Sequence, residues 1–322
     1  MVNNFGRGCV VGRGSWGRLL LLALIWGSGF LWIKLALRGF TPVQITIVRL
    51  LLGAAVLAPI ALARRMPVPS GSRTWFHLVV AALLANVVPY TLFGIGQQTI
   101  DSNIAGVLNA TTPLWTVVIA LLAGGEQRVT LGRASGLAAG FAGTVLIFTP
   151  WESATDVASW AGLACLAASA SYGAGYVYMG RYLTGRNIPP IMLSACQLAA
   201  GAAVLALALP FGGLTAPNWS AVPVGSLLVL GTVGTGLAYV LNYRLIGDLG
   251  STAASTTTYL LPVVAVVLGA LVLAEPVTLP MLAGMALVLT GITLAQRRAP
   301  AAVAPPRTPL ATPRENPRGL PE

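Results

Sequence analysis

Charge is scarce in this sequence. Only 8% of its 322 residues are charged, whereas 56% are hydrophobic, and the mean hydropathy is +0.80. A soluble domain of this size needs many more polar side chains to cover its surface, so the composition excludes an ordinary soluble fold. We therefore expect an integral membrane protein that has the lipid bilayer as its surroundings.

Residues that carry out chemistry are equally few. The chain has one histidine, His77, and none of its eight acidic residues lies near the middle of an apolar segment. The three cysteines, Cys9, Cys165 and Cys196, lack the spacing of a disulfide or metal motif. An enzyme would need a nucleophile with a base, or a cluster of metal ligands. We predict no catalytic site, no metal and no other cofactor. The short loops also make a receptor or scaffold a weak alternative.

What the sequence does contain is a series of long apolar segments. A bilayer core of about 30 Å takes a helix of about 20 residues. Stretches rich in proline, glycine and charge separate ten segments of that length. The predicted spans are 18–37, 42–63, 75–97, 102–124, 131–149, 159–181, 189–210, 220–243, 249–273 and 279–296. The predicted fold class is an all-α integral membrane protein with ten transmembrane helices.

The positions of the basic residues predict the orientation in the membrane. If both termini are cytoplasmic, 16 of the 19 basic residues fall on the cytoplasmic side, where such residues are normally retained. The exceptions are Arg49 inside the second span and Lys34 and Arg38 at the outer end of the first. The net charge of +11 therefore reflects topology, and we predict no nucleic-acid partner.

The chain contains an internal repeat. "RLLLGAAVLA" begins at Arg49, and "QLAAGAAVLA" begins at Gln197, 148 residues later. Similar offsets relate "WGSGF" at 26–30 to "YGAGY" at 172–176, Tyr90 to Tyr239, and Pro113 to Pro262. Several matches in the same order at one spacing indicate two halves of five spans each.

Because five is an odd number of crossings, the second half must enter the membrane from the opposite side. We predict a cytoplasmic tail at 1–17, a first five-helix repeat at 18–150, an inverted repeat at 151–298 and a disordered Pro-rich cytoplasmic tail at 299–322. Inverted repeats are typical of secondary transporters, in which the ligand binds near the midplane between the repeats.

Longer stretches carry a resemblance to a known family. "WGSGFLWIKLAL" in the first span, "PVQITIVRLLLGAAVL" in the second, and the spacing of Pro113 to Glu126, repeated as Pro262 to Glu275, resemble the drug/metabolite transporter (DMT) superfamily and, within it, the EamA family. The resemblance covers roughly residues 17–297. It implies a multi-pass carrier of the bacterial inner membrane that exports amino acids, other metabolites or toxic compounds. We expect a secondary transporter of a small molecule working by alternating access, with multidrug or toxic-cation efflux as the alternative. No oligomeric state is predicted.

Two prolines mark the expected middle of the protein. Pro113 and Pro262 each lack a backbone donor, so the carbonyls of Asn109 and Thr258 lose their usual helical partner. At about 1.5 Å per residue, both prolines lie roughly 16 to 20 Å from the start of their spans, near the middle of the membrane. The polar side chains around these kinks either satisfy the freed carbonyls or line a ligand site.

Arg49 is the most informative single residue. An unpaired guanidinium near the centre of a span costs about 2.5 to 3.5 kcal/mol, and less when it reaches toward the surface. Arg49, with Lys34, either attracts an anionic or zwitterionic substrate, or binds carbonyl groups and holds two helices together. Gln197 occupies the inverted position.

The predicted cavity lies between the halves and is lined by spans 1, 3, 4, 6, 8 and 9. In "WGSGF" and "YGAGY", the small residues allow helices to approach closely, and the flanking aromatic residues are candidates for the cavity wall. The candidate substrate-binding residues are Trp26, Ser28, Lys34, Arg49, Tyr90, Asn109, Tyr172, Tyr239 and Thr258.

Overall fold

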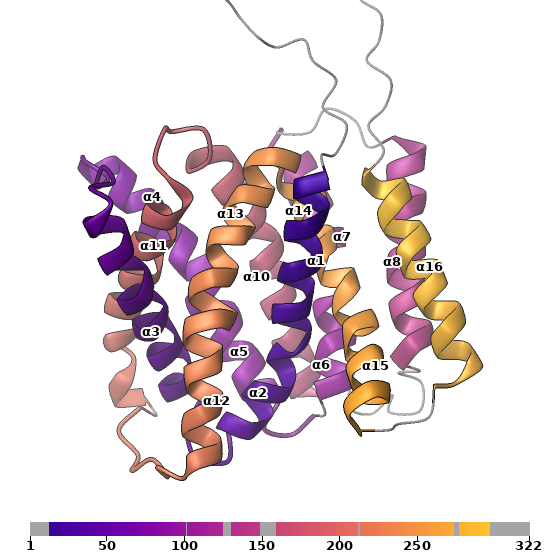
Figure 1. Ribbon diagram of the computed structural model, residues 1–322, viewed down its shortest axis with the longest axis horizontal. Coiled ribbons are helices and arrows are strands. Elements are labelled where there is room, and N and C mark those ends of the chain that lie inside the picture. The colour runs from indigo at the N-terminus through magenta and orange to yellow at the C-terminus, as the bar shows by residue number, and fades with distance from the viewer. Residues whose placement is uncertain are drawn as a thin grey trace, which may run out of the picture.

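The computed structural model describes residues 13–100, 102–124, 130–148, 159–211, 213–273 and 277–296. Throughout these ranges the regular secondary structure is helical (Figure 1), which confirms the all-α class. The predicted C-terminal tail at 299–322, most of the N-terminal tail, and Glu126 and Glu275 lie outside the described residues.

The helices of the first half follow the predicted spans, and several spans are divided into two or three pieces. In chain order they are α1 (Arg13–Gly27), α2 (Gly29–Ala36), α3 (Pro42–Ala63), α4 (Ser72–Ala82), the π-helical segment η1 (Leu83–Val87), α5 (Val88–Gly96), α6 (Ser102–Asn109), α7 (Thr112–Leu122) and α8 (Leu131–Phe148). The third span thus consists of α4, η1 and α5, and the fourth of α6 and α7.

The second half repeats this order. Its elements are α10 (Trp160–Tyr182), α11 (Pro190–Ala206), the short 3₁₀ helix η3 (Leu209–Phe211), α12 (Ala221–Gly231), the π-helical segment η4 (Thr232–Leu237), α13 (Ala238–Leu249), α14 (Ser251–Ser255), the 3₁₀ segment η5 (Thr256–Tyr259), α15 (Leu260–Leu273) and α16 (Leu279–Gln296). A π-helical segment therefore interrupts the third helix of each half at the same place.

Five helical stretches of the described chain are long and apolar enough to cross a bilayer. They are Gly14–Ala36, Pro42–Ala63, Ser72–Gly96, Ile104–Leu122 and Ala221–Leu249. Three shorter apolar helices, Ala134–Ile147, Pro190–Ala206 and Leu279–Leu294, fall within other predicted spans. These helices support a membrane protein, and the count of ten crossings stays a prediction.

Equivalent elements of the two halves run in opposite directions (Figure 1). In the third span the chain passes downward from α4 to α5, whereas in its equivalent it passes upward from α12 to α13. In the fourth span the chain rises from α6 to α7, and its equivalent descends from α14 to α15. The two halves are thus related as an inverted pair within the fold.

The repeated decapeptides pack against each other across the α3–α11 contact. A Cβ atom at Gly53 would lie 2.8 Å from Cδ1 of Leu198, and one at Gly201 would lie 3.3 Å from Cδ1 of Leu50. Leu50 and Leu198 are equivalent positions of the two copies, so the contact is reciprocal. The absence of a side chain on each glycine lets the two helices approach closely.

Side chains from the other half reach the π-helical segment η1. Pro89 follows this segment and has no N–H group, so one carbonyl group a turn earlier in the chain is left without a helical donor. The hydroxyl of Ser171 donates to the carbonyl of Leu84 at 2.7 Å, and the hydroxyl of Tyr239 donates to that of Ala85. Side chains of the second half therefore stabilise the irregular turn of the first.

The segment η4 is held in the equivalent way. The indole Nε1 of Trp26 donates to the carbonyl of Gly234 at 3.2 Å, and Gly234 stands 149 residues after Ala85. Thr235 adds a bond within its own helix, because its hydroxyl donates to the carbonyl of Leu230 at 2.7 Å. Each half thus supplies an aromatic donor to the irregular turn of the other.

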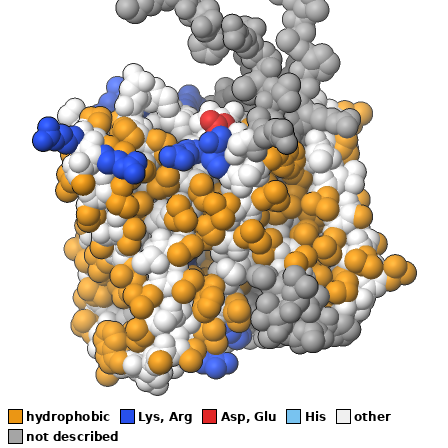
Figure 2. Space-filling model, in the orientation of Figure 1, with side chains coloured by type: hydrophobic (Ala, Val, Ile, Leu, Met, Phe, Trp, Pro, Cys, Tyr) orange, Lys and Arg blue, Asp and Glu red, His pale blue; other side chains and the backbone are white. Residues whose placement is uncertain are grey.

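Charged side chains gather at one end of the helices. Figure 2 shows basic groups along the upper edge, where α1 and α4 begin and α3 and α13 end, above a broad apolar band. At this edge Arg18 pairs with Asp248 at 2.6 Å and joins the first half to the second. The apolar band is the surface expected to contact lipid.

Candidate functional site

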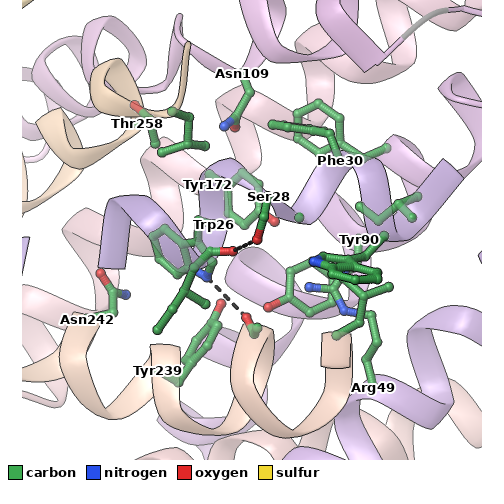
Figure 3. Close-up of a pocket in the computed structure, with 18 of the residues that line it drawn as sticks. Trp26, Ser28, Phe30, Arg49, Tyr90, Asn109, Tyr172, Tyr239, Asn242 and Thr258 are labelled. Atoms are coloured by element: carbon green, nitrogen blue, oxygen red, sulfur yellow. Dashed lines mark hydrogen bonds between the residues drawn. The ribbon is translucent and has the colours of Figure 1, made fainter. Parts of the chain in front are cut away.

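A cavity of about 350 Å³ lies between the two halves near the middle of the helices. Its lining comes from α1, α2 and α3, from the divided third and fourth spans and their equivalents, and from α10. Eight of the nine candidate residues line it (Figure 3): Trp26, Ser28, Arg49, Tyr90, Asn109, Tyr172, Tyr239 and Thr258. The structure thus brings together residues that are up to 232 positions apart in the sequence.

Aromatic rings form a continuous wall of this cavity. Phe30 lies edge-on to Phe93, which stacks on Tyr172 with ring centroids 5.9 Å apart. Tyr172 in turn lies edge-on to Tyr90 at 6.3 Å. On another side Trp26 packs against Tyr239 at 6.4 Å. Such a wall offers apolar area and ring faces to a ligand.

Arg49 is the charged member of the lining. Only 6% of the residue is exposed. Its Nε donates to the hydroxyl of Thr235 at 3.2 Å, and its guanidinium carbon lies 3.8 Å from the centroid of the Tyr90 ring. In the described part of the chain the one carboxylate is that of Asp248, which pairs with Arg18. The Arg49 charge thus faces the cavity with a hydroxyl and an aromatic ring as its described neighbours.

Gln197 is the residue equivalent to Arg49 in the second half. It is fully buried and does not line the cavity. Its Nε2 donates to Oδ1 of Asn86 at 2.6 Å, and its Oε1 accepts from the hydroxyl of Tyr243. Asn86 and Thr235 are equivalent residues of η1 and η4, so Arg49 and Gln197 each bind the irregular turn of the opposite half. The charge is a feature of one half alone.

The two proline breaks meet on one side of the cavity. Pro113 follows the interruption between α6 and α7, and Pro262 follows η5. Thr111 donates to the carbonyl of Leu108 at 2.7 Å, and Thr258 donates to that of Ser255 at 2.9 Å. These local hydrogen bonds lie within the irregular turns, but they go to other carbonyls than those of Asn109 and Thr258, which the prolines free. Asn109 and Thr258 line the cavity (Figure 3), as the second interpretation of these polar segments expects.

Two candidate residues have surroundings that differ from the expectation. Lys34 does not line the cavity: its Nζ donates to the carbonyl of Ile100 at 3.2 Å and ties α2 to the loop before α6. The cause is its position on the outer end of α2, on a face turned toward that loop. Ser28 lines the cavity, but its hydroxyl donates to the carbonyl of Ile25 at 3.0 Å within its own helix.

Several lining residues were not candidates in the sequence. Asn242 on α13 and Phe93 on α5 both contribute to the cavity. Asn242 lies three residues after Tyr239, on the same face of a helix, and this spacing in an apolar span was the available signal. Phe93 lies three residues after Tyr90 in the same way, but one more phenylalanine in an apolar segment resembles any core residue.

The cavity suits the binding of a small organic molecule. It combines aromatic walls, one guanidinium and a few amide and hydroxyl groups, which is the usual chemistry of a ligand pocket. Within the described ranges no three His, Cys, Asp or Glu side chains gather as metal ligands would.

Several known proteins with similar sequences are named as transporters. The model of the EamA-like transporter family matches residues 16–149 and 159–296. The chain is 28% identical to an uncharacterized transporter of Bacillus subtilis, YvbV, over 88% of its own length and 92% of that protein. It is 29% identical to an uncharacterized inner membrane transporter of Escherichia coli, YedA, over 79% and 81% of the two chains.

A solved structure shares the fold. It is 19% identical to this chain and superposes with a TM-score of 0.68 over 88% of this chain and 97% of the other. The two matches of the family model fall on the two halves, which confirms the two-repeat architecture. The prediction that the chain is not an enzyme agrees with the relatives, which are named as transporters. Together the two matched repeats show that the chain belongs to the EamA-like transporter family.

Proposed function

We propose that this transporter exports small metabolites that carry a carboxylate group, amino acids among them, by alternating access. The observation that carries this proposal is the Arg49 guanidinium, which lines the cavity and has no carboxylate partner among the described residues. A carboxylate ligand would supply the charge-assisted hydrogen bonds that this guanidinium can donate. The aromatic wall would cover the apolar part of the ligand.

The architecture supports alternating access. The cavity lies between two inverted repeats, and irregular helical turns in both repeats border it. In such carriers one repeat moves against the other around a central site. The divided third and fourth spans and their equivalents offer positions at which the helices can bend.

The cellular setting is proposed on other grounds. The E. coli relative is named as an inner membrane transporter, and we extend that location to this chain. Ten crossings, with both termini in the cytoplasm, agree with the distribution of basic residues. Export, as opposed to uptake, rests on the resemblance to carriers of this family.

Efflux of drugs or toxic cations is the second candidate. The aromatic wall favours it, because ring faces attract cations. Arg49 opposes it, since its guanidinium already covers the Tyr90 ring at 3.8 Å and repels a second positive charge. An efflux substrate without a carboxylate would therefore be transported without help from Arg49.

The test compares cells that overproduce the native protein with cells that overproduce an Arg49→Gln variant at equal membrane levels. Extracellular metabolites are measured by mass spectrometry. We expect specific carboxylate compounds to accumulate outside cells with the native protein, and their export to fall about tenfold or more in the variant, because charge-assisted hydrogen bonds are lost.

An Arg38→Gln variant is the matched control. Arg38 follows α2, is exposed and lies outside the cavity, so the same loss of charge there leaves export unchanged. If carboxylate compounds do not accumulate outside cells with the native protein, the proposed function is wrong. Arg49-independent resistance to cationic compounds would instead support the second candidate.

A further inference from the structure

Asn242 is a buried amide that the fold itself does not use. Only 1% of the residue is exposed, and its Oδ1 has no hydrogen-bond partner in the described part of the chain. It belongs to the lining of the cavity, and Figure 3 shows it beside Tyr239 and away from Arg49. An unpaired buried polar group destabilises a fold, so native proteins rarely retain one without a use.

The equivalent position of the first half shows that packing does not require an amide. Phe93 stands 149 residues before Asn242, on α5, and it also lines the cavity. Its ring packs against those of Phe30 and Tyr172. The same place in the fold is thus filled by an aromatic ring in one half and by a hydrogen-bonding group in the other.

Asn242 lies at a fixed separation from the Arg49 guanidinium. Thr235, which accepts the hydrogen bond of Arg49, is followed four residues later by Tyr239 and seven residues later by Asn242. Tyr239 and Asn242, three residues apart, lie on one face of α13, and Thr235 lies in the π-helical segment before it. Seven residues correspond to about 10 Å along a helix axis. The two polar sites are therefore about two helical turns apart, with the Tyr239 ring between them.

We propose that Asn242 is a second polar subsite that binds a hydrogen-bonding group at the far end of a carboxylate-bearing substrate. This inference rests on the proposed function and specifies the class of substrate. The α-amino and α-carboxylate groups of an amino acid are bonded to one carbon atom and are too close together to reach both sites. The substrate carries its carboxylate at Arg49, an apolar middle along Tyr239 and Trp26, and a hydroxyl, amide or ammonium group at Asn242.

The test uses two probes that differ in one group at the far end. L-norleucine has an apolar end, whereas 6-hydroxy-L-norleucine carries a hydroxyl there. The purified full-length protein is reconstituted in liposomes, and the transport of each radiolabelled probe is measured. We expect the native protein to transport the hydroxylated probe about tenfold or more faster than norleucine at low concentration, because only that probe pairs with the amide.

Two variants remove the amide. Asn242→Leu and the smaller Asn242→Ala are both expected to abolish the preference, so that the ratio of the two transport rates falls to about one in each variant. Gln97→Leu is the control, because Gln97 is equally buried, also lacks a hydrogen-bond partner in the described chain, and does not line the cavity. This control should keep the preference of the native protein.

The outcomes separate this inference from the proposed function. If both Asn242 variants keep the native preference while Arg49→Gln slows both probes, the carboxylate site stands and the Asn242 subsite is wrong. If the native protein transports the two probes equally, the subsite is also wrong. If it transports neither probe, the proposed carboxylate class fails, and the Asn242 subsite fails with it.

Discussion

Arg49 is held in place by groups that do not neutralise it. The hydroxyl of Thr235 accepts from its Nε, and the Tyr90 ring lies under its guanidinium. Neither group carries a negative charge, so both orient the guanidinium while its charge remains available to a ligand. A buried carboxylate would have had the opposite effect, since a buried ion pair saturates the hydrogen bonds of both partners.

Thr235→Val tests this positioning role. Valine has nearly the shape of threonine, but the hydrogen bond to Arg49 Nε is lost. A hydrogen bond to a charged group is worth about 1.5 to 3 kcal/mol, so we expect the affinity for a carboxylate substrate to fall about tenfold or more. Transport rates over a range of substrate concentrations, in liposomes, measure this change.

Two further variants distinguish positioning from general damage. Thr232→Val removes a hydroxyl from the same segment η4, but that hydroxyl donates to Leu228 of its own helix, so substrate affinity should stay native. Thr235→Ser keeps the hydroxyl and should restore most of the affinity. Equal loss in Thr232→Val and Thr235→Val would contradict a specific role for Thr235.

The sequence predicted the cavity residues best where both halves of the repeat have an aromatic residue at the equivalent position. Trp26 and Tyr172 stand in paired motifs, Tyr90 and Tyr239 are equivalent, and all four line the cavity. Lys34 was a candidate but does not line the cavity. A charged residue at the end of a span indicates its depth in the membrane, but not the face of the helix on which it lies. Asn242 was missed because its partner, Phe93, is apolar, so the repeat did not mark the position.

Glycine allows the close contact between α8 and α16. A Cβ atom at Gly143 of α8 would lie 2.6 Å from the carbonyl oxygen of Gly284 and 2.7 Å from the backbone nitrogen of Val288, both on α16. Backbone atoms cannot rotate away as a side chain can. Even one methyl group at Gly143 therefore forces α8 and α16 apart.

Gly143→Ala is expected to lower the thermal stability of the purified protein, because overpacking costs about 1 to 3 kcal/mol. Gly247→Ala is the matched control. Gly247 lies in α13, and a Cβ atom there would meet nothing within 4 Å, so the better helix propensity of alanine should leave stability equal or slightly higher. Apparent melting temperatures in detergent compare the two variants. A stabilised Gly143→Ala variant would contradict the described packing.

Helices were easier to predict than their interruptions. Hydropathy, together with the stretches rich in proline, glycine and charge between the segments, predicted the apolar helices to within a few residues, because membrane thickness fixes their length. The segments η1 and η4 were not predicted. The carbonyl groups of Ala85 and Gly234 are satisfied by Tyr239 and Trp26 from the opposite half, and the sequence of one helix does not reveal donors that lie far along the chain.

The orientation of the whole molecule gives a prediction that needs no substrate. The loop between α3 and α4 contains Arg64 and Arg65, and the loop between η3 and α12 has no basic residue. Basic loops are retained in the cytoplasm. Ser70 in the first loop and Ala216 in the second are both exposed, so a cysteine at either position can react with a reagent.

We expect Ala216→Cys to react with a membrane-impermeant maleimide in intact spheroplasts, and Ser70→Cys to react only after the membrane is permeabilised. A Cys9→Ser background removes the cysteine nearest the N-terminus, while Cys165 and Cys196 are buried. The opposite pattern of labelling would reverse the orientation. Labelling of both positions from outside would show that the loops lie on one side and would disprove the predicted crossings between them.

The reciprocal contact of the decapeptides bears on how the two halves diverged. Gly53 needs its small size because Leu198 lies against it, and Gly201 stands in the same relation to Leu50. Each copy therefore packs against the other. A larger side chain at either glycine would disturb the packing unless the leucine opposite it also changed. Their first residues, Arg49 and Gln197, contact irregular turns instead of this seam. The contact between the two copies does not restrain these first residues, so one half could acquire a buried charge that the other half lacks.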